Sequence, residues 1–197
     1  MAFFFAALAV PQTWAAPDAV AGKAKAQLCA ACHGEYGVSS MPDTPHLAAQ
    51  PALSIFYQLL QFRDQRRKGG GMEAIATTLT EQDMRDIAAH YATLPAPAPQ
   101  TGGDAQKIAR GQQIAQQQYC SSCHGAQLQG QKHVPRLSGQ SHAYFVTQLR
   151  NLRSGARADM DGTMASAARS LTDEEIEAMA AYARSLPCTD LRHANLY

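Results

Sequence analysis

The residues best suited to chemistry in this sequence are cysteines and histidines that recur at one fixed spacing. Two Cys-x-x-Cys-His segments stand ninety-one positions apart: Cys29, Cys32 and His33, then Cys120, Cys123 and His124. At this spacing the three side chains of a segment reach the same face of a helical turn. Two thiols so placed can add to the vinyl groups of haem while the imidazole binds iron from the same side. We therefore predict two covalently bound haem c groups, held by the four cysteines, with both histidines as axial iron ligands.

Three other kinds of site also use paired cysteines. A zinc site would have to combine the two segments, and their separation of ninety-one positions is unlike zinc-ribbon spacing. A thioredoxin-like pair needs a strand-to-helix junction in an α/β pattern, which this sequence lacks. A disulfide within a Cys-x-x-Cys unit is strained, because only two residues close the loop. The doubled motif favours haem attachment over all three.

The second axial ligand is predicted to be a methionine in each half of the chain. Met72 and Met164 follow their histidines by 39 and 40 residues, and each stands seven positions before a Leu-Thr pair. Any methionine can instead fill space in a core. Of the seven methionines, however, only these two occupy equivalent places in both halves. A thioether ligand stabilises ferrous iron and closes the sixth position, which disfavours substrate chemistry at the metal.

Two prolines and two arginines are candidates for a supporting role. Pro45 and Pro135 follow the histidines by twelve and eleven residues. Each can offer its backbone carbonyl to the free imidazole N–H, which would fix the ring and raise its basicity; the alternative is an ordinary loop proline. Arg67 and Arg157 occupy equivalent places and are either partners of haem propionates or solvated side chains.

The remaining histidines and the fifth cysteine show no repeated pattern. We expect the histidines at the surface: His46, His90, His133, His142 and His193. Cys188 is either a free thiol or an intermolecular link.

The elements that must position these residues form a tandem repeat of helices. Matching residues recur at offsets of ninety to ninety-two positions, and a Pro/Gly-rich stretch separates the two copies. Helix N-caps are predicted at Thr80, Asp104 and Thr172, each before an apolar stripe at helical spacing. No segment alternates with period two for long enough to indicate a sheet, so the fold class is all-α. The predicted divisions are a first domain at 17–95, a linker at 96–103, a second domain at 104–190 and a tail at 191–197.

The first sixteen residues, 1–16, are uncharged and mostly apolar and end in small residues. This pattern predicts a secretory signal peptide and therefore export to the periplasm. The formal net charge of +1 gives no support for nucleic-acid binding.

With these motifs the chain resembles the cytochrome c4 family of tandem dihaem cytochromes c. The resemblance rests on the two Cys-x-x-Cys-His-Gly motifs, the Pro-x-Leu…Gln segments at 45–50 and 135–140, and the late methionines before Leu-Thr helix starts. It implies two class I cytochrome c domains related by pseudo-twofold symmetry, with His/Met ligation of both irons.

The resemblance also implies a function. We expect an electron carrier, not an enzyme, that accepts electrons from a quinol–cytochrome c reductase and passes them to a terminal oxidase, docking transiently on these membrane complexes. An alternative is a dihaem cytochrome subunit of a periplasmic dehydrogenase that oxidises a sulfur compound or an alcohol. A dihaem peroxidase is a third possibility, but it would need an open iron position.

Overall fold

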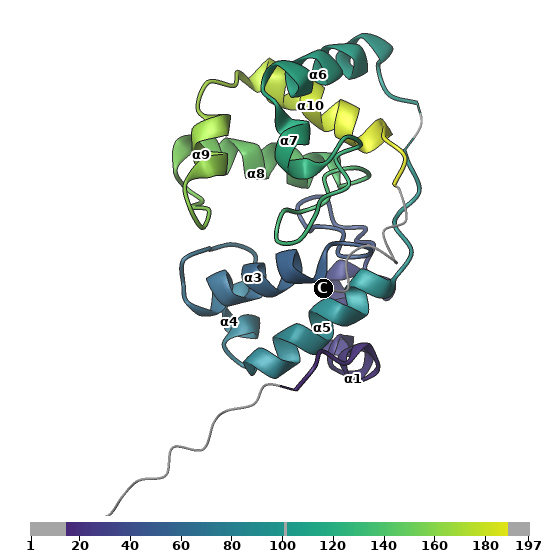
Figure 1. Ribbon diagram of the computed structural model, residues 1–197, viewed down its shortest axis with the longest axis vertical. Coiled ribbons are helices and arrows are strands. Elements are labelled where there is room, and N and C mark those ends of the chain that lie inside the picture. Colours follow the sequence, from purple (N-terminus) through teal and green to yellow (C-terminus); the bar gives the residue numbers. More distant parts are fainter. Residues whose placement is uncertain (1–14, 101, 189–197) are drawn as a thin grey trace, which may run out of the picture.

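The computed structural model describes residues 15–100 and 102–188, and within these ranges the chain forms helices and loops without a β-strand. Two lobes follow one another along the chain (Figure 1). The first contains α1 (Ala19–Lys25), α2 (Gln27–His33), α3 (Ala52–Arg63), α4 (Met72–Ala76) and α5 (Glu81–Thr93). The second contains α6 (Ala105–Gln117), α7 (Cys120–His124), α8 (His142–Ser154), α9 (Thr163–Ala168) and α10 (Asp173–Ser185). The predicted all-α class and the tandem repeat are confirmed.

Parts of the predicted layout fall outside these residues or stay predictions. Positions 1–14 of the expected signal peptide and the tail at 191–197 lie outside the described residues. The boundaries of the linker at 96–103 remain a prediction. In the middle of that stretch the Gln100 amide donates to the Arg184 carbonyl at 3.2 Å, which connects the stretch to the end of α10. Within the described ranges, every helix is too short or too polar to cross a membrane.

The long helices begin where their capping residues predict. Asp104 accepts hydrogen bonds from the amides of Gln106 and Lys107 at the start of α6. Thr80 and Thr172 each form a complete capping box. The threonine side chain accepts a hydrogen bond from the amide of the third helical residue, and the carboxylate of that residue accepts one from the threonine amide. Such caps satisfy amides that have no partner inside the helix. The helix starts are therefore set by local sequence.

In each lobe the first and last helices pack closely together, α1 against α5 and α6 against α10 (Figure 1). A glycine lies at each crossing. A Cβ added to Gly111 would lie 2.6 Å from the carbonyl carbon of Ala178 and closer still to its oxygen, and one added to Gly22 would overlap the Asp86 carbonyl. Real Cβ atoms do not approach a backbone so closely, so these contacts require glycine.

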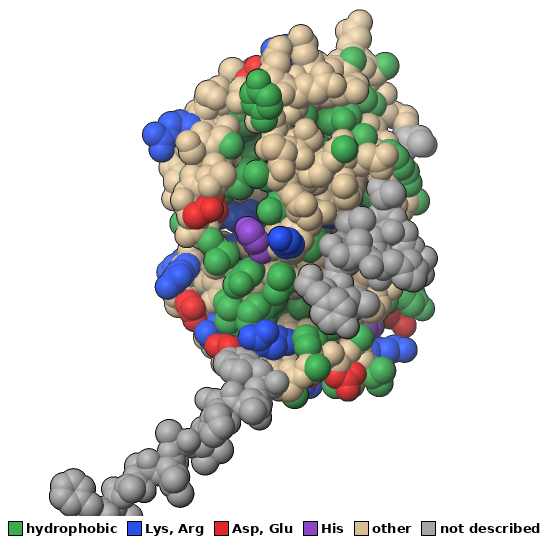
Figure 2. Space-filling view, in the orientation of Figure 1, with side chains coloured by type: hydrophobic (Ala, Val, Ile, Leu, Met, Phe, Trp, Pro, Cys, Tyr) green, Lys and Arg blue, Asp and Glu red, His purple; other side chains and the backbone are tan. Residues whose placement is uncertain are grey.

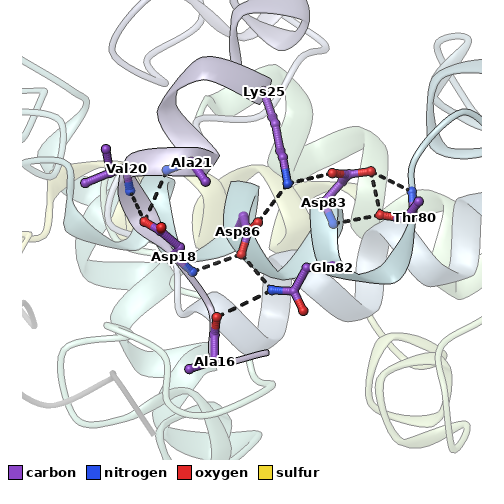
Figure 3. Close-up of polar contacts among 9 residues, drawn as sticks. All are labelled: Ala16, Asp18, Val20, Ala21, Lys25, Thr80, Gln82, Asp83 and Asp86. Carbon is purple, nitrogen blue, oxygen red and sulfur yellow. Dashed lines mark hydrogen bonds and ion pairs between the residues drawn. The ribbon is translucent and has the colours of Figure 1, made fainter. Parts of the chain in front are cut away.

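The crossing in the first lobe is reinforced by a buried carboxylate (Figure 3). The Lys25 ammonium lies 2.6 Å from Asp83 and 2.8 Å from Asp86. Asp86 also accepts from the Asp18 amide and from the Gln82 side chain, both at 2.9 Å. Hydrogen bonds from Lys25 and Thr80 hold the pKa of Asp83 at about 2, below its usual 3.8. These contacts fasten the N-terminal helix to α5.

Each lobe has its own apolar core, built on the stripes predicted for α5 and α10. Met84, Ile87 and Tyr91 are at most 1% exposed in the first lobe, and Ile176 and Ala183 are fully buried in the second. On the face drawn in Figure 2, apolar side chains are visible over both lobes, and basic side chains lie beside a histidine near the middle of the face.

Candidate haem-binding sites

The two Cys-x-x-Cys-His segments lie on short helices, as their spacing predicts. In the first lobe the segment ends α2, and in the second it forms the whole of α7. Both helices end at a glycine, Gly34 or Gly125, with a φ of 80° or 84° that turns the chain sharply after the histidine. All five cysteines lie within the described residues and none forms a disulfide. The first cysteine of each motif is partly or fully buried and the second is exposed.

Each motif histidine is held by the proline carbonyl that the sequence singled out. His33 Nδ1 lies 3.0 Å from the Pro45 oxygen, and His124 Nδ1 lies 2.9 Å from the Pro135 oxygen. A carbonyl can only accept, so Nδ1 carries the proton and donates it. The other ring nitrogen, Nε2, is then left with a free lone pair. This is the tautomer that can bind a metal through Nε2.

The surroundings of the two rings also suit a metal ligand. Both histidines are about 95% buried, and burial lowers the pKa of each despite the opposing bond to proline. His124 Nε2 is buried without a hydrogen-bond partner. Leaving such an atom unpaired costs about 1–3 kcal/mol. An iron bound at Nε2 would remove that cost, so the residues present fit a haem attached through the neighbouring cysteines.

The two methionines pack against the same apolar cores as the first cysteine of each motif. Met72 is the first residue of α4 and directly follows the left-handed Gly71, whereas Met164 is the second residue of α9, two positions after the left-handed Gly162. Met72 packs against the cluster that includes Cys29, and Met164 against the cluster that Cys120 contacts. The fold thus brings the cysteine and methionine of each copy onto one core. Iron ligation by the two methionines stays a prediction.

Two expectations about the remaining polar residues are wrong. His46 is only 4% exposed and His90 only 9%, so neither lies at the surface. His46 Nδ1 accepts the Ser39 amide at 3.0 Å. His193 lies outside the described residues. A histidine without a repeated counterpart carries no local signal of burial, because its neighbours are distant in sequence: Gln140 at His46 and Gly22 of α1 at His90.

The equivalent arginines meet between the lobes instead of being solvated. Arg67 is 6% exposed and donates to Gln148 at 3.0 Å and to the Tyr144 hydroxyl at 2.7 Å, both in the second lobe. Arg157 donates to Gln58 of the first lobe at 3.1 Å. Burial, followed by the charge of Arg67, lowers the pKa of Arg157 to about 10. Their pairing with haem propionates remains a prediction.

The sequence reading missed the role of a pair of glutamines. Gln50 and Gln140 are buried and bond across the lobe boundary to the loops that hold the histidines. Their repeated place after Pro-x-Leu was visible in the sequence, but nothing local indicated a partner in the other copy. Arg136 is likewise 1% exposed and donates to the Ala48 carbonyl of the first lobe at 2.7 Å.

Comparison with known proteins gives the same picture for both lobes. The family model described as "Cytochrome c" matches residues 108–187, and the one described as "Cytochrome C oxidase, cbb3-type, subunit III" matches 15–90. The chain is 40% identical to cytochrome c4 of Thiocapsa roseopersicina, over 86% of this chain and 93% of the relative. It is 31% identical to the thiosulfate dehydrogenase electron acceptor of Thiomonas intermedia, over 92% of this chain and 89% of that protein.

A solved structure agrees as well. Reduced recombinant cytochrome c4 from Pseudomonas stutzeri superposes with a TM-score of 0.80 at 29% identity, over 87% of this chain and all of that one. The relatives and the structure span both lobes, and each lobe carries a complete attachment motif. The chain therefore belongs to the cytochrome c4 family of electron carriers, and it carries two covalently bound haem c groups.

Proposed function

We propose that this cytochrome works in the periplasm, taking electrons from a quinol–cytochrome c reductase and delivering them to a terminal oxidase. The observation that carries the proposal is the state of the two histidines. Each donates through Nδ1 to a proline carbonyl, and in His124 the buried Nε2 has no other partner. This arrangement supports iron ligation by a histidine held in one fixed orientation, as an electron carrier needs. Periplasmic location is supported by the signal peptide predicted from residues 1–16.

The proposed ligand sets assign separate roles to three kinds of residue: cysteine, histidine and methionine. Haem, when bound, supplies reversible one-electron exchange at its iron. The motif cysteines would hold it covalently, the histidines and the methionine thioethers would bind its iron, and the soft thioethers would favour the ferrous state. If histidine and methionine both bind the iron, no position would remain on it for a substrate, as an electron carrier requires. The sets are Cys29, Cys32, His33 and Met72, and Cys120, Cys123, His124 and Met164.

The ligand sets are tested by counting haems and by removing one methionine at a time. A pyridine haemochrome assay should give two haems c per chain. Met72→Ala and Met164→Ala should each remove half of the methionine-to-iron charge-transfer band of the ferric protein. Met84→Leu is the matched control, because Met84 is a fully buried core methionine and a volume-conserving change there should leave the band intact. A full band in either alanine variant would contradict that assignment.

The direction of electron flow is tested with the natural redox complexes. Purified oxidised protein should be reduced by quinol only when a quinol–cytochrome c reductase is present, and the reduced protein should be reoxidised by membranes that contain the terminal oxidase. Failure of both reactions, with intact haems, would overturn this proposal.

A second candidate is an electron acceptor for a periplasmic dehydrogenase. It is favoured by the similarity to the Thiomonas intermedia protein, whose name assigns it to thiosulfate dehydrogenase. Rapid reduction by thiosulfate with that enzyme, together with co-purification of the two polypeptides, would select this candidate over the respiratory one.

A further inference from the structure

At the boundary between the lobes, two glutamine side chains, one from each lobe, make equivalent pairs of hydrogen bonds to the backbone of the other lobe. Gln50 of the first lobe accepts the Arg136 amide through Oε1 and donates to the Arg136 carbonyl through Nε2, both at 2.9 Å. Gln140 of the second lobe accepts the His46 amide at 2.7 Å and donates to the His46 carbonyl at 3.1 Å. Each glutamine thus uses both the oxygen and the nitrogen of its side-chain amide to bond the backbone of one residue in the opposite lobe.

The two residues bonded in this way, His46 and Arg136, directly follow the prolines whose carbonyls orient the motif histidines. The Pro135 carbonyl and the Arg136 amide belong to the same peptide group. His124 donates to the oxygen of that group at 2.9 Å, and the nitrogen of that group donates to Gln50 at 2.9 Å. The peptide therefore links His124 of the second lobe to Gln50 of the first. The Pro45 peptide links His33 to Gln140 in the same way.

Hydrogen bonds at the two ends of one peptide strengthen each other, because each bond polarises the group for the other. An acceptor on the amide makes the carbonyl oxygen more negative. The carbonyl then draws the Nδ1 proton more strongly, and the histidine becomes a more basic ligand. A more basic ligand stabilises ferric iron and lowers the reduction potential.

We infer that Gln50 and Gln140 are cross-lobe positioning residues, each tuning the axial histidine, and hence the reduction potential, of the haem in the opposite lobe. The inference rests on the proposed ligation by His33 and His124. Because these hydrogen bonds exist only when the lobes are docked, the reduction potential of each haem depends partly on the opposite lobe. Both glutamines are about 95% buried, so water does not replace the lost contacts readily.

The test uses Gln50→Met, which keeps the length of the side chain and removes its amide. The reduction potential of the second-lobe haem should rise, with about a twofold increase in its reduced-to-oxidised ratio at fixed ambient potential, because one such bond strengthens its neighbour by ~10–30%. The potential of the first-lobe haem should stay unchanged. Gln140→Met should give the reverse pattern, although it also unpairs the Ser141 amide, which shares the Gln140 oxygen.

Potentials of the full-length holoprotein are read by an NMR-monitored redox titration, with haem methyl signals assigned to each lobe. The Nδ1 proton of His124 in the reduced protein gives a direct second readout, and it should move upfield in Gln50→Met while that of His33 does not. Gln50→Glu keeps an acceptor for the Arg136 amide and should hold the His124 proton at or downfield of its wild-type position. If Gln50→Met fails to fold, Gln50→Glu and Gln140→Met still decide the question.

Thr147→Val is the matched control. It removes another contact between the lobes, the 3.1 Å bond from Thr147 to Asp43, without touching either histidine-linked peptide. Unchanged potentials in this variant and crossed shifts in the glutamine variants support the inference. Equal shifts of both haems, a shift confined to the variant's own lobe, or a shift in Thr147→Val would overturn it. Absence of iron-bound histidine signals in the wild type would instead overturn the proposed ligand set.

Discussion

Replacing Gly111 by alanine should loosen the second lobe at the crossing of α6 and α10. The new Cβ would lie 2.6 Å from the Ala178 carbonyl carbon and 2.8 Å from the Tyr182 Cβ. Normal carbon contacts are about 3.5–4.0 Å, so the helices must separate by roughly an ångström. Overpacking costs about 1–3 kcal/mol. The obstacle here is backbone that cannot rotate away, which places the cost near ~3 kcal/mol.

Alanine also recovers about 1 kcal/mol, because glycine is the poorer helix former. The expected net result is a loss of about 2 kcal/mol in the unfolding free energy of the second lobe. Guanidinium unfolding of the holoprotein, followed by far-ultraviolet circular dichroism and haem absorbance, measures it. Gln112→Ala on the exposed side of the same helix is the control and should stay within ~0.5 kcal/mol of wild type. A Gly111→Ala protein as stable as wild type would refute the close crossing.

Three further outcomes follow from the structure. Thr172→Ala removes a capping box and should cost about 1 kcal/mol of second-lobe stability in the same unfolding assay, with no loss expected if the cap were unimportant. Lys25→Met should make the first lobe unfold at higher pH in an acid titration. The depressed pKa of Asp83, about 2 against 3.8, stabilises the wild type above pH ~4, and this contribution is lost as the pH falls towards 2. An unchanged acid midpoint would contradict this. Thiol titration of the denatured holoprotein should find only Cys188 reactive, since the four motif cysteines are held in thioethers; additional thiols would contradict covalent attachment at both sites.

Local sequence alone determined the helices, the repeat and the chemistry of the attachment motifs. A Cys-x-x-Cys-His segment is complete within five residues, so its geometry depends only on one helical turn. Capping boxes such as that of Thr172 are equally local. The repeat allowed predictions beyond a single helical turn, because equivalent positions identified Pro45 and Pro135. The structure places both carbonyls at the histidines as expected.

Only the tertiary structure decided what surrounds these motifs. Gln50 and Arg136 are 86 positions apart, and His46 and Gln140 are 94 apart, so their pairing exists only when the lobes dock. The burial of His46 and Arg67 has the same origin, since residues from the other copy cover them. Periodicity identifies a face to be buried, but it does not identify the distant surface that will bury it. The attachment motifs and their histidines were therefore identifiable from sequence, whereas the hydrogen bonds across the lobe boundary required the folded pair of domains.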